Sequence, residues 1–350
     1  MITPFSINQR AIGPGSPCFI IAEAGVNHNG DVAMARRLVE AAVAAGADAI
    51  KFQTFKAAKL ASACAPKANY QLATTSGKET QQAMLQKLEL PHDAHLDLMA
   101  LCKERGIIFL SSPFEEESAS FLKNIGVAAL KIPSGEITNF PFLQHVADLG
   151  LPLILSTGMA TLAEVDEGMR VLREAGCNNV ALLHCVSNYP AAPADCNLRA
   201  MATMEAAFKV AIGFSDHTLG AEVAHAAVAL GATIIEKHIT LDKTMEGPDQ
   251  PASLEPQELI NFVRGIRAVE SSLGNGRKEP ALSERNTAMV ARKSIVAAAT
   301  IPAGTVIARS MVFMCRPGTG LSSKMLPHVV GRKAKSPIPA GQTLELAHLA

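Results

Sequence analysis

The 350-residue sequence lacks an excess of charge of either sign, because 32 Lys and Arg residues balance 32 Asp and Glu residues. Without a net field, we expect no attraction to nucleic acid or to an anionic membrane. The sequence also lacks an apolar run of about 18 residues, which a membrane-spanning helix requires. Its first residues, MITPFS, lack the basic head and apolar run of a signal peptide. We therefore expect a soluble, cytoplasmic protein.

Paired cysteine motifs are absent as well. The seven cysteines are odd in number and dispersed, and none forms the CxxC pair that is typical of zinc or redox sites. We expect reduced thiols with structural roles. These residues are Cys18, Cys64, Cys102, Cys177, Cys185, Cys196 and Cys315.

What the sequence does contain is an alternation of short apolar, β-branched runs with longer amphipathic stretches, from Cys18 to about Gly274. This pattern is typical of successive βα units. An open, doubly wound sheet would alternate similarly, but eight runs, each with polar residues at its end, favour a (β/α)8 TIM barrel of roughly 250 residues. The expected strands are Cys18–Glu23, Asp48–Thr54, Ile107–Ser112, Ala129–Ser134, Pro152–Thr157, Val180–Cys185, Val210–Ser215 and Thr233–His238.

Helices are expected between the strands, each apolar on one face and with Gly at or near its end. The clearest are residues 33–46, 95–106 and 162–176. Residues 55–91 form an insertion too long for an ordinary βα loop. It predicts either a flap over a site or a surface excursion.

The pattern changes after the expected barrel, residues 1–274. Residues 275–290 are polar and predict a linker. Residues 291–350 contain short strands and an approximate repeat, IPAGTVI and IPAGQTL, which predict a small β-rich domain. We expect this domain to have little core of its own and to need docking.

Polar residues gather at the ends of the expected strands, the face on which barrel enzymes build their sites. So many polar groups on one rim would be costly without a ligand, so we expect a reactive site. The set comprises Glu23, Lys51, Gln53, Ser111, Ser112, Lys131, Ser134, Glu136, Ser156, Thr157, His184, Ser215, His217 and His238.

Two histidines follow neighbouring strands. His217 comes after the seventh expected strand and His238 ends the eighth, so a closed barrel places the imidazoles side by side. Such a pair suits a divalent metal ion. Separate acid-base or hydrogen-bonding histidines are the alternative. His28, in NHNG, is a third candidate ligand, although Asn-Gly there also fits turn chemistry.

Lys51 and Lys131 lie near serines, an arrangement that holds a phosphate by charge and hydrogen bonds. A class I aldolase would instead use one such lysine as a Schiff base. Glu136, in PSGE, is the carboxylate that we expect to transfer a proton or to orient water. Asp249, in GPDQ, could bind a hydroxyl or a metal, or belong to an ordinary loop.

The motifs EAGVNHNG, KFQTFKA, SSPF, KIPSGE, LSTGM, LLHC with NYP, FSDHT, EKHITLDK, GPD and RPGTG span almost the whole chain. Together they resemble the N-acetylneuraminate (sialic acid) synthase family, which includes legionaminic and pseudaminic acid synthases. The C-terminal residues resemble the antifreeze-like (SAF) domain of those enzymes.

The resemblance implies a phosphoenolpyruvate-dependent, C–C bond-forming transferase. It also implies a domain-swapped homodimer and a divalent ion, Mn²⁺ or else Mg²⁺ or Co²⁺, on His217 and His238. It assigns catalytic roles to Glu136, Glu23 and His238. The substrate-binding residues would be Lys51, Gln53, Ser112, Lys131, Ser134, Ser156, Ser187, Tyr189, Ser215, Asp249 and Arg316.

Some positions and the acceptor stay open. Ser187 stands where some members carry Asn, and Thr319 replaces the Asn of a common RPGNG. Without the family, Arg316 would be an ordinary surface arginine. We expect N-acetylmannosamine as acceptor, giving N-acetylneuraminate and phosphate. The phosphate of N-acetylmannosamine and a 2,4-diacetamido-2,4,6-trideoxyhexose are the alternative acceptors. The non-enzymatic alternative is an ice- or carbohydrate-binding protein with an inactive barrel.

Overall fold

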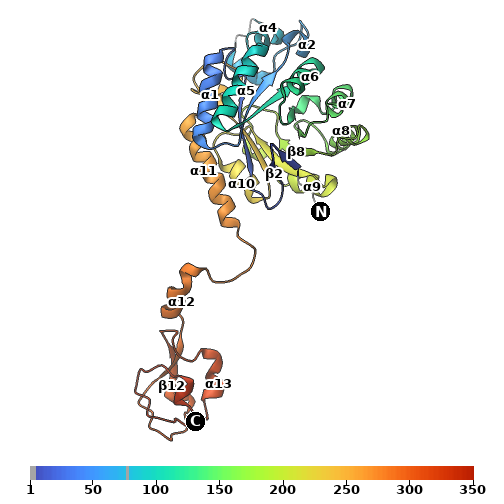
Figure 1. Ribbon diagram of the computed structural model, residues 1–350. Helices are drawn as coiled ribbons and strands as arrows, with labels where there is room; N and C mark the ends of the chain where they lie inside the picture. The colour runs from blue at the N-terminus through green and yellow to red at the C-terminus, as the bar shows by residue number, and fades with distance from the viewer. Residues whose placement is uncertain (1–4, 76–78) are drawn as a thin grey trace. The chain divides into compact units, whose positions relative to one another are not determined.

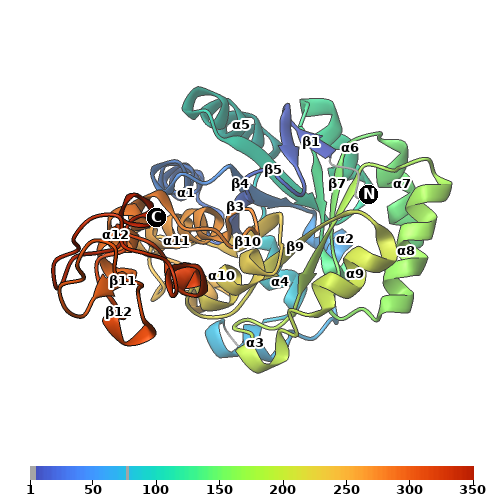
Figure 2. The same ribbon diagram turned by 90° about the horizontal axis from the view of Figure 1, so that it is seen from below.

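The structure, a computed structural model, describes residues 5–75 and 79–350. The chain forms two compact units, Met1–Gly274 and Asn275–Ala350. The first unit contains an eight-stranded parallel sheet in the order β5-β4-β3-β10-β9-β8-β7-β6. β5 and β6, the two ends of this order, lie against each other, so the sheet curls into the predicted barrel (Figure 2). The strands are β3 Phe19–Gly25, β4 Ala49–Thr54, β5 Ile108–Pro113, β6 Leu130–Ile132, β7 Leu153–Ser156, β8 Val180–Cys185, β9 Ala211–Asp216 and β10 Ile234–His238.

Helices surround this sheet, as the periodicity predicts (Figure 1). The Asp31 side chain caps α1 by accepting a hydrogen bond from the Ala33 N–H, and Gly46 ends the helix in the left-handed conformation. The three clearest predicted helices are α1 Val32–Ala45, α5 His92–Arg105 and α8 Leu162–Glu174. The others are α6 Glu116–Ile125, α7 Phe140–Asp148, α9 Ala200–Phe208, α10 Glu222–Ala229 and α11 Pro256–Leu273.

Strand alternation divides the apolar side chains into two layers. On β3, Phe19 and Ile21 belong to the cluster inside the barrel, whereas Ile20 and Ala22 pack in the larger cluster with the helices. The same period of two places Glu23 above Ile21 on the inner face. The barrel interior is therefore filled with apolar side chains up to the level where its strands end, and polar groups begin there.

An N-terminal hairpin, which the sequence analysis did not foresee, lies at the opposite end of the barrel. Strands β1 Phe5–Ile7 and β2 Arg10–Ile12 pair antiparallel. Ile7 and Ile12 are fully buried in the cluster that fills the barrel. The hairpin thus covers the interior from the end where the strands begin, far from the polar residues.

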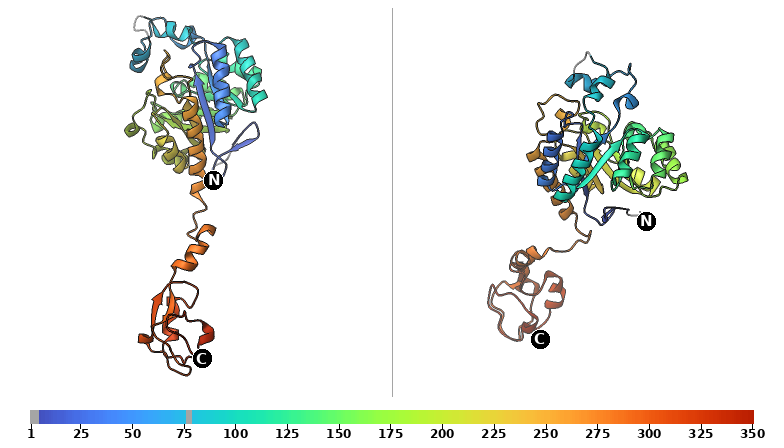
Figure 3. Two further views of the ribbon diagram at one scale, coloured as in Figure 1. Left: turned by 90° about the vertical axis from the view of Figure 1, so that its left-hand side faces the viewer. Right: turned by 45° about the horizontal axis from the view of Figure 1, so that its top comes forward.

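The insertion carries three short helices, α2 Ala57–Leu60, α3 Asn69–Thr74 and α4 Gln81–Gln86. They lie beyond the carboxyl ends of the strands (Figure 3). Phe55, Val26 and Leu88 form a small apolar cluster beneath them. The Ala57 N–H donates to Glu89 Oε1 over 2.6 Å, so the two ends of the insertion are joined.

The second unit has a core, contrary to expectation. Strands β11 Ser294–Ala297 and β12 Val312–Cys315 pair antiparallel. The two IPAG repeats bridge each other: Ile301 and Ile338 exchange backbone hydrogen bonds of 2.8 and 2.9 Å and are both buried. Because the repeats pair, their apolar residues gather in one cluster with Ile295, Ala297, Ile307, Val312, Val329, Ala334 and Leu344.

The remaining elements of this unit are short. The segment expected to be a linker contains η4 Leu282–Glu284 and begins α12 Arg285–Ala291. Further along the chain are η5 Arg309–Met311, η6 Ser323–Met325, α13 Leu326–Val329 and η7 Leu346–His348. Across the described residues of both units, no helix is long and apolar enough to cross a membrane.

A fully buried ion pair joins β9 to β10 on the outer face of the barrel. Lys237 Nζ lies 2.9 Å from Asp216 Oδ2, and both side chains are inaccessible to solvent. Asp216 Oδ1 accepts from the Thr218 N–H and hydroxyl, and Lys237 also donates to the Thr218 carbonyl. The network fixes the chain on both sides of His217.

We expect Lys237→Met to lower the free energy of unfolding by about 3–5 kcal/mol, because it leaves the Asp216 carboxylate buried without its cation. Lys243→Met, which removes an exposed pair with Glu258, serves as the control and should cost less than about 1 kcal/mol. Urea denaturation of both variants measures the difference. Equal losses would show that burial of the Lys237 pair does not matter.

Candidate active site

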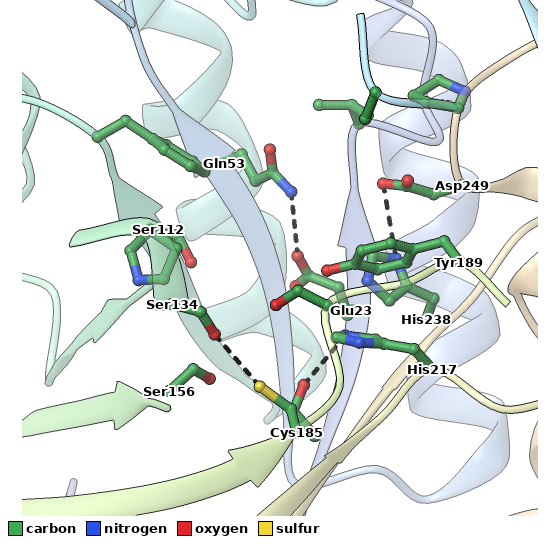
Figure 4. A pocket seen from close by; sticks show the side chains of 18 of the residues that line it. Glu23, Gln53, Ser112, Ser134, Ser156, Cys185, Tyr189, His217, His238 and Asp249 are labelled. Atoms are coloured by element: carbon green, nitrogen blue, oxygen red, sulfur yellow. Dashed lines mark hydrogen bonds and ion pairs between the residues drawn. The ribbon is translucent and has the colours of Figure 1, made fainter. Parts of the chain in front are cut away.

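A cavity of about 390 Å³ opens where the barrel strands end. Figure 4 shows side chains from several strands converging on it. The structure brings most of the predicted residues to this one cavity. Those lining it are Glu23, Lys51, Gln53, Ser112, Lys131, Ser134, Ser156, Ser187, Tyr189, Ser215, His217, His238 and Asp249.

Two lysines and two glutamates form a buried charge network on the cavity floor. Lys51 Nζ lies 2.7 Å from Glu23 Oε2 and 3.7 Å from Glu236 Oε2. Lys131 Nζ lies 3.5 Å from Glu236 Oε1, so Glu236 lies between the two ammonium groups. All four side chains are at most 7% exposed. The two cations are therefore held together although like charges repel.

The surroundings of the two glutamates shift their pKa values in opposite directions. Burial raises the pKa of Glu23 to about 7, and the charge of Lys51 offsets only part of this effect. Burial would also raise the pKa of Glu236, but Lys131 and Lys51 outweigh it and lower the value to about 2. Burial alone would lower the pKa of Lys51, yet Glu23 and Glu236 raise it. Lys51 therefore stays an ammonium ion at neutral pH.

Two buried cavity atoms, Ser156 Oγ and His238 Nδ1, have no hydrogen-bond partner within the described part of the chain. Buried polar atoms are rarely left in this state, because each loses its bonds to water. Their concentration at one cavity indicates that a polar ligand completes the site.

The two histidines are neighbours, with ring centroids 5.5 Å apart. The His217 ring is oriented by a 2.7 Å contact from Nδ1 to the Val186 carbonyl, which leaves Nε2 on the cavity side, 3.4 Å from Ser215 Oγ. His238 Nδ1 lies 3.9 Å from Asp249 Oδ2. Burial lowers the pKa of His217 to about 4 and that of His238 well below its ordinary value. Both imidazoles are thus neutral at pH 7, the form that binds metals.

These donors fit a divalent ion in part. Across residues 5–75 and 79–350, no three His, Cys, Asp or Glu side chains are grouped closely enough to hold a metal by themselves. His217 and His238 would supply two ligands, and the unpartnered His238 Nδ1 is suited to this role. Catalytic metal sites keep open positions for substrate or water, so an incomplete protein ligand set is compatible with such a site.

A second polar cluster surrounds Gly158. Its N–H donates to Ser134 Oγ over 2.9 Å, and Ser134 Oγ lies 3.2 Å from Cys185 Sγ. A Cβ on Gly158 would lie 2.3 Å from Ser187 Oγ and 2.9 Å from both Cys185 Sγ and Ser134 Oγ. Only glycine therefore lets these side chains converge. The hydroxyl groups of Ser134 and Ser187, which line the cavity together with Lys131, are suited to bind an anionic group.

Three predicted rim residues do not line the cavity. Ser111 contacts Thr54 Oγ1 at 2.7 Å, and His184 Nε2 contacts the Cys196 carbonyl at 2.7 Å, so both belong to the layer beneath the helices. Thr157 Oγ1 donates to the Leu183 carbonyl. The prediction that these residues face the site was wrong, because it ignored that neighbouring residues on a strand point to opposite faces.

Glu136 and Arg316 also lie outside the cavity lining. Glu136 is half-buried in η1 Ser134–Glu136, and its Oε2 accepts from Asn139 Nδ2 over 2.7 Å. Arg316 belongs to the second unit, where its Nε donates to the Ala291 carbonyl. The roles expected for both residues stay predictions.

Of the two interpretations of the NHNG motif, the structure supports a turn rather than a metal ligand at His28. It is fully buried and does not line the cavity. Its Nδ1 accepts from the Gly30 N–H over 3.0 Å, and Asn29 and Gly30 have positive φ. The side chain thus stabilises the turn before α1.

Glu236, Cys185 and Tyr70 are among the cavity residues that the sequence analysis missed. Strand alternation could have predicted Glu236, because it lies two residues before His238 on β10 and therefore shares its face. The same alternation places Cys185 above Leu183, which is inside the barrel. No strand pattern could have predicted Tyr70, because it belongs to the insertion and not to a strand end.

Comparison with known proteins shows the family to which the chain belongs. Residues 38–278 match the NeuB family, and residues 292–350 match the SAF domain. The chain belongs to the NeuB family. It is 45% identical over 341 residues to the N,N'-diacetyllegionaminic acid synthase of Legionella pneumophila, covering 96% of each chain. It is 47% identical over 317 residues to the same-named protein of Campylobacter jejuni, covering 90% of this chain and 95% of the relative.

A solved structure supports the same relationship. The N-acetylneuraminic acid (sialic acid) synthetase of Leptospira borgpetersenii, in complex with citrate, has a TM-score of 0.73 and 36% identity. The alignment covers 82% of this chain and 95% of the other. This NeuB-family protein therefore shares its fold, its barrel and its SAF domain with sugar-acid synthases.

We expect Gly158→Ala to lower kcat/KM for sugar-acid synthesis by about 100-fold. The added methyl group would displace Ser187, Ser134 or Cys185 from the polar cluster around Gly158. Steady-state kinetics measure the effect, and thermal unfolding shows whether the fold is kept. A folded variant with unchanged kinetics would show that this convergence of side chains has no role in turnover.

Proposed function

We propose that this protein condenses phosphoenolpyruvate with a 2,4-diacetamido-2,4,6-trideoxyhexose and water to give N,N'-diacetyllegionaminic acid and phosphate. The identity of 45–47% over at least nine-tenths of the two legionaminic acid synthases carries this choice. It favours the alternative acceptor of the sequence analysis over N-acetylmannosamine. The catalytic barrel and the convergent cavity argue against a non-enzymatic binding protein.

The cavity offers groups suited to both substrates. Lys51 and Lys131, with the serines beside them, are placed to bind the phosphate and carboxylate of phosphoenolpyruvate. In the reaction, C3 of phosphoenolpyruvate bonds to the aldehyde carbon of the open-chain sugar, whose oxygen takes up a proton, and C2 is left as a cationic centre. Water adds at C2 and loses one proton. The C2–O bond to phosphate then breaks, and the second proton of that water is lost, so that C2 becomes the ketone carbon of the product. Glu23 and Glu236 line the same cavity as the lysines and the imidazoles, and their carboxyl groups are suited to proton transfer and to stabilisation of a cationic centre.

The charge network disfavours the Schiff-base alternative. A Schiff base forms from a neutral amine, which requires a lowered lysine pKa. The pKa of Lys51 is raised, because Glu23 and Glu236 outweigh the effect of its burial. The ammonium group is thus suited to bind an anion rather than to attack a carbonyl group.

His217 and His238 would hold the divalent ion, which we expect to be Mn²⁺. When bound, it would polarise the acceptor carbonyl as a Lewis acid. The 5.5 Å separation of the rings and the neutral state of both imidazoles support this role. A cytoplasmic homodimer, with Arg316 carried to the site of the partner subunit, completes the proposal.

We expect phosphate release only when phosphoenolpyruvate and the sugar are both present, with kcat/KM highest for the trideoxy acceptor. A coupled phosphate assay with Mn²⁺ should compare this acceptor, N-acetylmannosamine and N-acetylmannosamine 6-phosphate, with and without chelator. Release without sugar would contradict the synthase. Borohydride trapping of pyruvate on a lysine, with no effect of chelator, would establish the aldolase instead.

We expect His217→Ala/His238→Ala to lose Mn²⁺ binding by at least about 100-fold, because both protein nitrogen ligands are removed. Electron paramagnetic resonance titration of free Mn²⁺ measures this without turnover. His328→Ala, which changes an exposed histidine, is the matched control. Unchanged affinity in the double variant would place the ion elsewhere.

A further inference from the structure

The cavity has two chemically different sides. The charged groups of the floor come from the barrel strands, whereas the insertion supplies an uncharged wall. Within the described residues, the part of the insertion that lines the cavity contains neither Lys, Arg, Asp nor Glu. This wall consists of Leu60, Ala68, Tyr70, Gln71, Gln81, Met84, Leu85 and Leu88.

The wall is packed against the barrel. Leu60, Leu85 and Phe114 pack on the buried cluster of Val26, Phe55 and Leu88, and the rings of Phe55 and Phe114 meet edge to face at 5.9 Å. A Cβ on Gly30 would lie 2.5 Å from the Lys87 carbonyl oxygen, so the loop before α1 approaches the end of α4 closely. The wall is therefore a fixed surface against which a ligand can be selected.

A row of rings connects this wall to the imidazole pair. Tyr70 and Tyr189 have ring centroids 4.9 Å apart, and Tyr189 lies 4.1 Å from His217 and 5.6 Å from His238. The ring of Tyr189 thus lies between the imidazole pair and the part of the insertion that carries Tyr70. A sugar whose aldehyde carbon is at the imidazoles and whose other carbons pass Tyr189 would meet the insertion with its remote end.

We propose that the wall formed by the insertion determines acceptor specificity, by selecting a sugar whose remote end is a methyl group and whose substituents are neutral. This inference rests on the proposed function and names the residues that choose among its acceptors. A methyl group gains apolar contact with Leu60, Leu85 and Met84. A hydroxymethyl group beside these three side chains would bury its hydroxyl against apolar atoms, and a phosphate would meet no cation among the described residues of the wall.

Leu85 gives the sharpest test, because it is half-buried in the wall while the next residue, Gln86, is exposed and does not line the cavity. Leu85→Lys places a cation on the wall, and Gln86→Lys places the same charge in solvent. We expect Leu85→Lys to raise the ratio of kcat/KM for N-acetylmannosamine 6-phosphate to that for the trideoxy acceptor by at least about 10-fold. Gln86→Lys should change this ratio by less than about 3-fold.

Leu60→Asn provides a second variant if Leu85→Lys does not fold, as judged by circular dichroism and thermal unfolding. It offers a hydrogen-bond partner at the wall and should raise the ratio for N-acetylmannosamine over the trideoxy sugar by about 10-fold. Ratios in the wall variants that match those of Gln86→Lys would overturn the proposal. The wild-type preference among acceptors tests the proposed function separately, because the change in ratio does not depend on which acceptor is best.

Discussion

The site depends on keeping two ammonium groups close together inside a protein. Lys51 and Lys131 repel each other, and burial disfavours the charge of each. Glu236, between them, makes this arrangement possible, and its own charge is stabilised by the same two lysines and by the Ser215 hydroxyl at 2.8 Å. Such a network is costly as a stabilising device. It is suited to a substrate that carries several negative charges.

The barrel supplies the geometry that this network needs. Neighbouring parallel strands bring these groups together: Glu23 of β3 pairs in register with Lys51 of β4 and with His238 of β10, and Glu236 lies two residues before His238 on β10. Outside the barrel, the Lys237–Asp216 pair holds the chain that carries His217. β10 therefore carries buried ion pairs on both faces: Glu236 faces the cavity, and Lys237 lies on the outer face beneath the helices.

The two sides of the cavity have different roles in the proposed function: the strand residues bind the reacting groups, and the insertion selects the acceptor sugar. The strands provide the charged groups suited to the condensation, and the insertion provides the uncharged wall. The insertion joins the barrel as a separately packed element, so its surface can change without disturbing the strands. This separation is typical of barrels, where rigid strands support chemistry and the loops set specificity.

The sequence by itself determined the barrel, because eight apolar runs with polar ends report a local periodicity that needs no knowledge of distant contacts. It also determined the polar strand-end residues that line the cavity floor, since strand ends meet at one rim. Its predictions for Ser111 and His184 were wrong because they neglected that neighbouring residues on a strand point to opposite faces of the sheet. The core of the second unit and the covering hairpin depend on pairing between remote segments, Ile301 with Ile338 and β1 with β2. Only the tertiary structure decided that Glu236 bridges two lysines and that Tyr70 reaches Tyr189, because both contacts join residues that no local pattern connects.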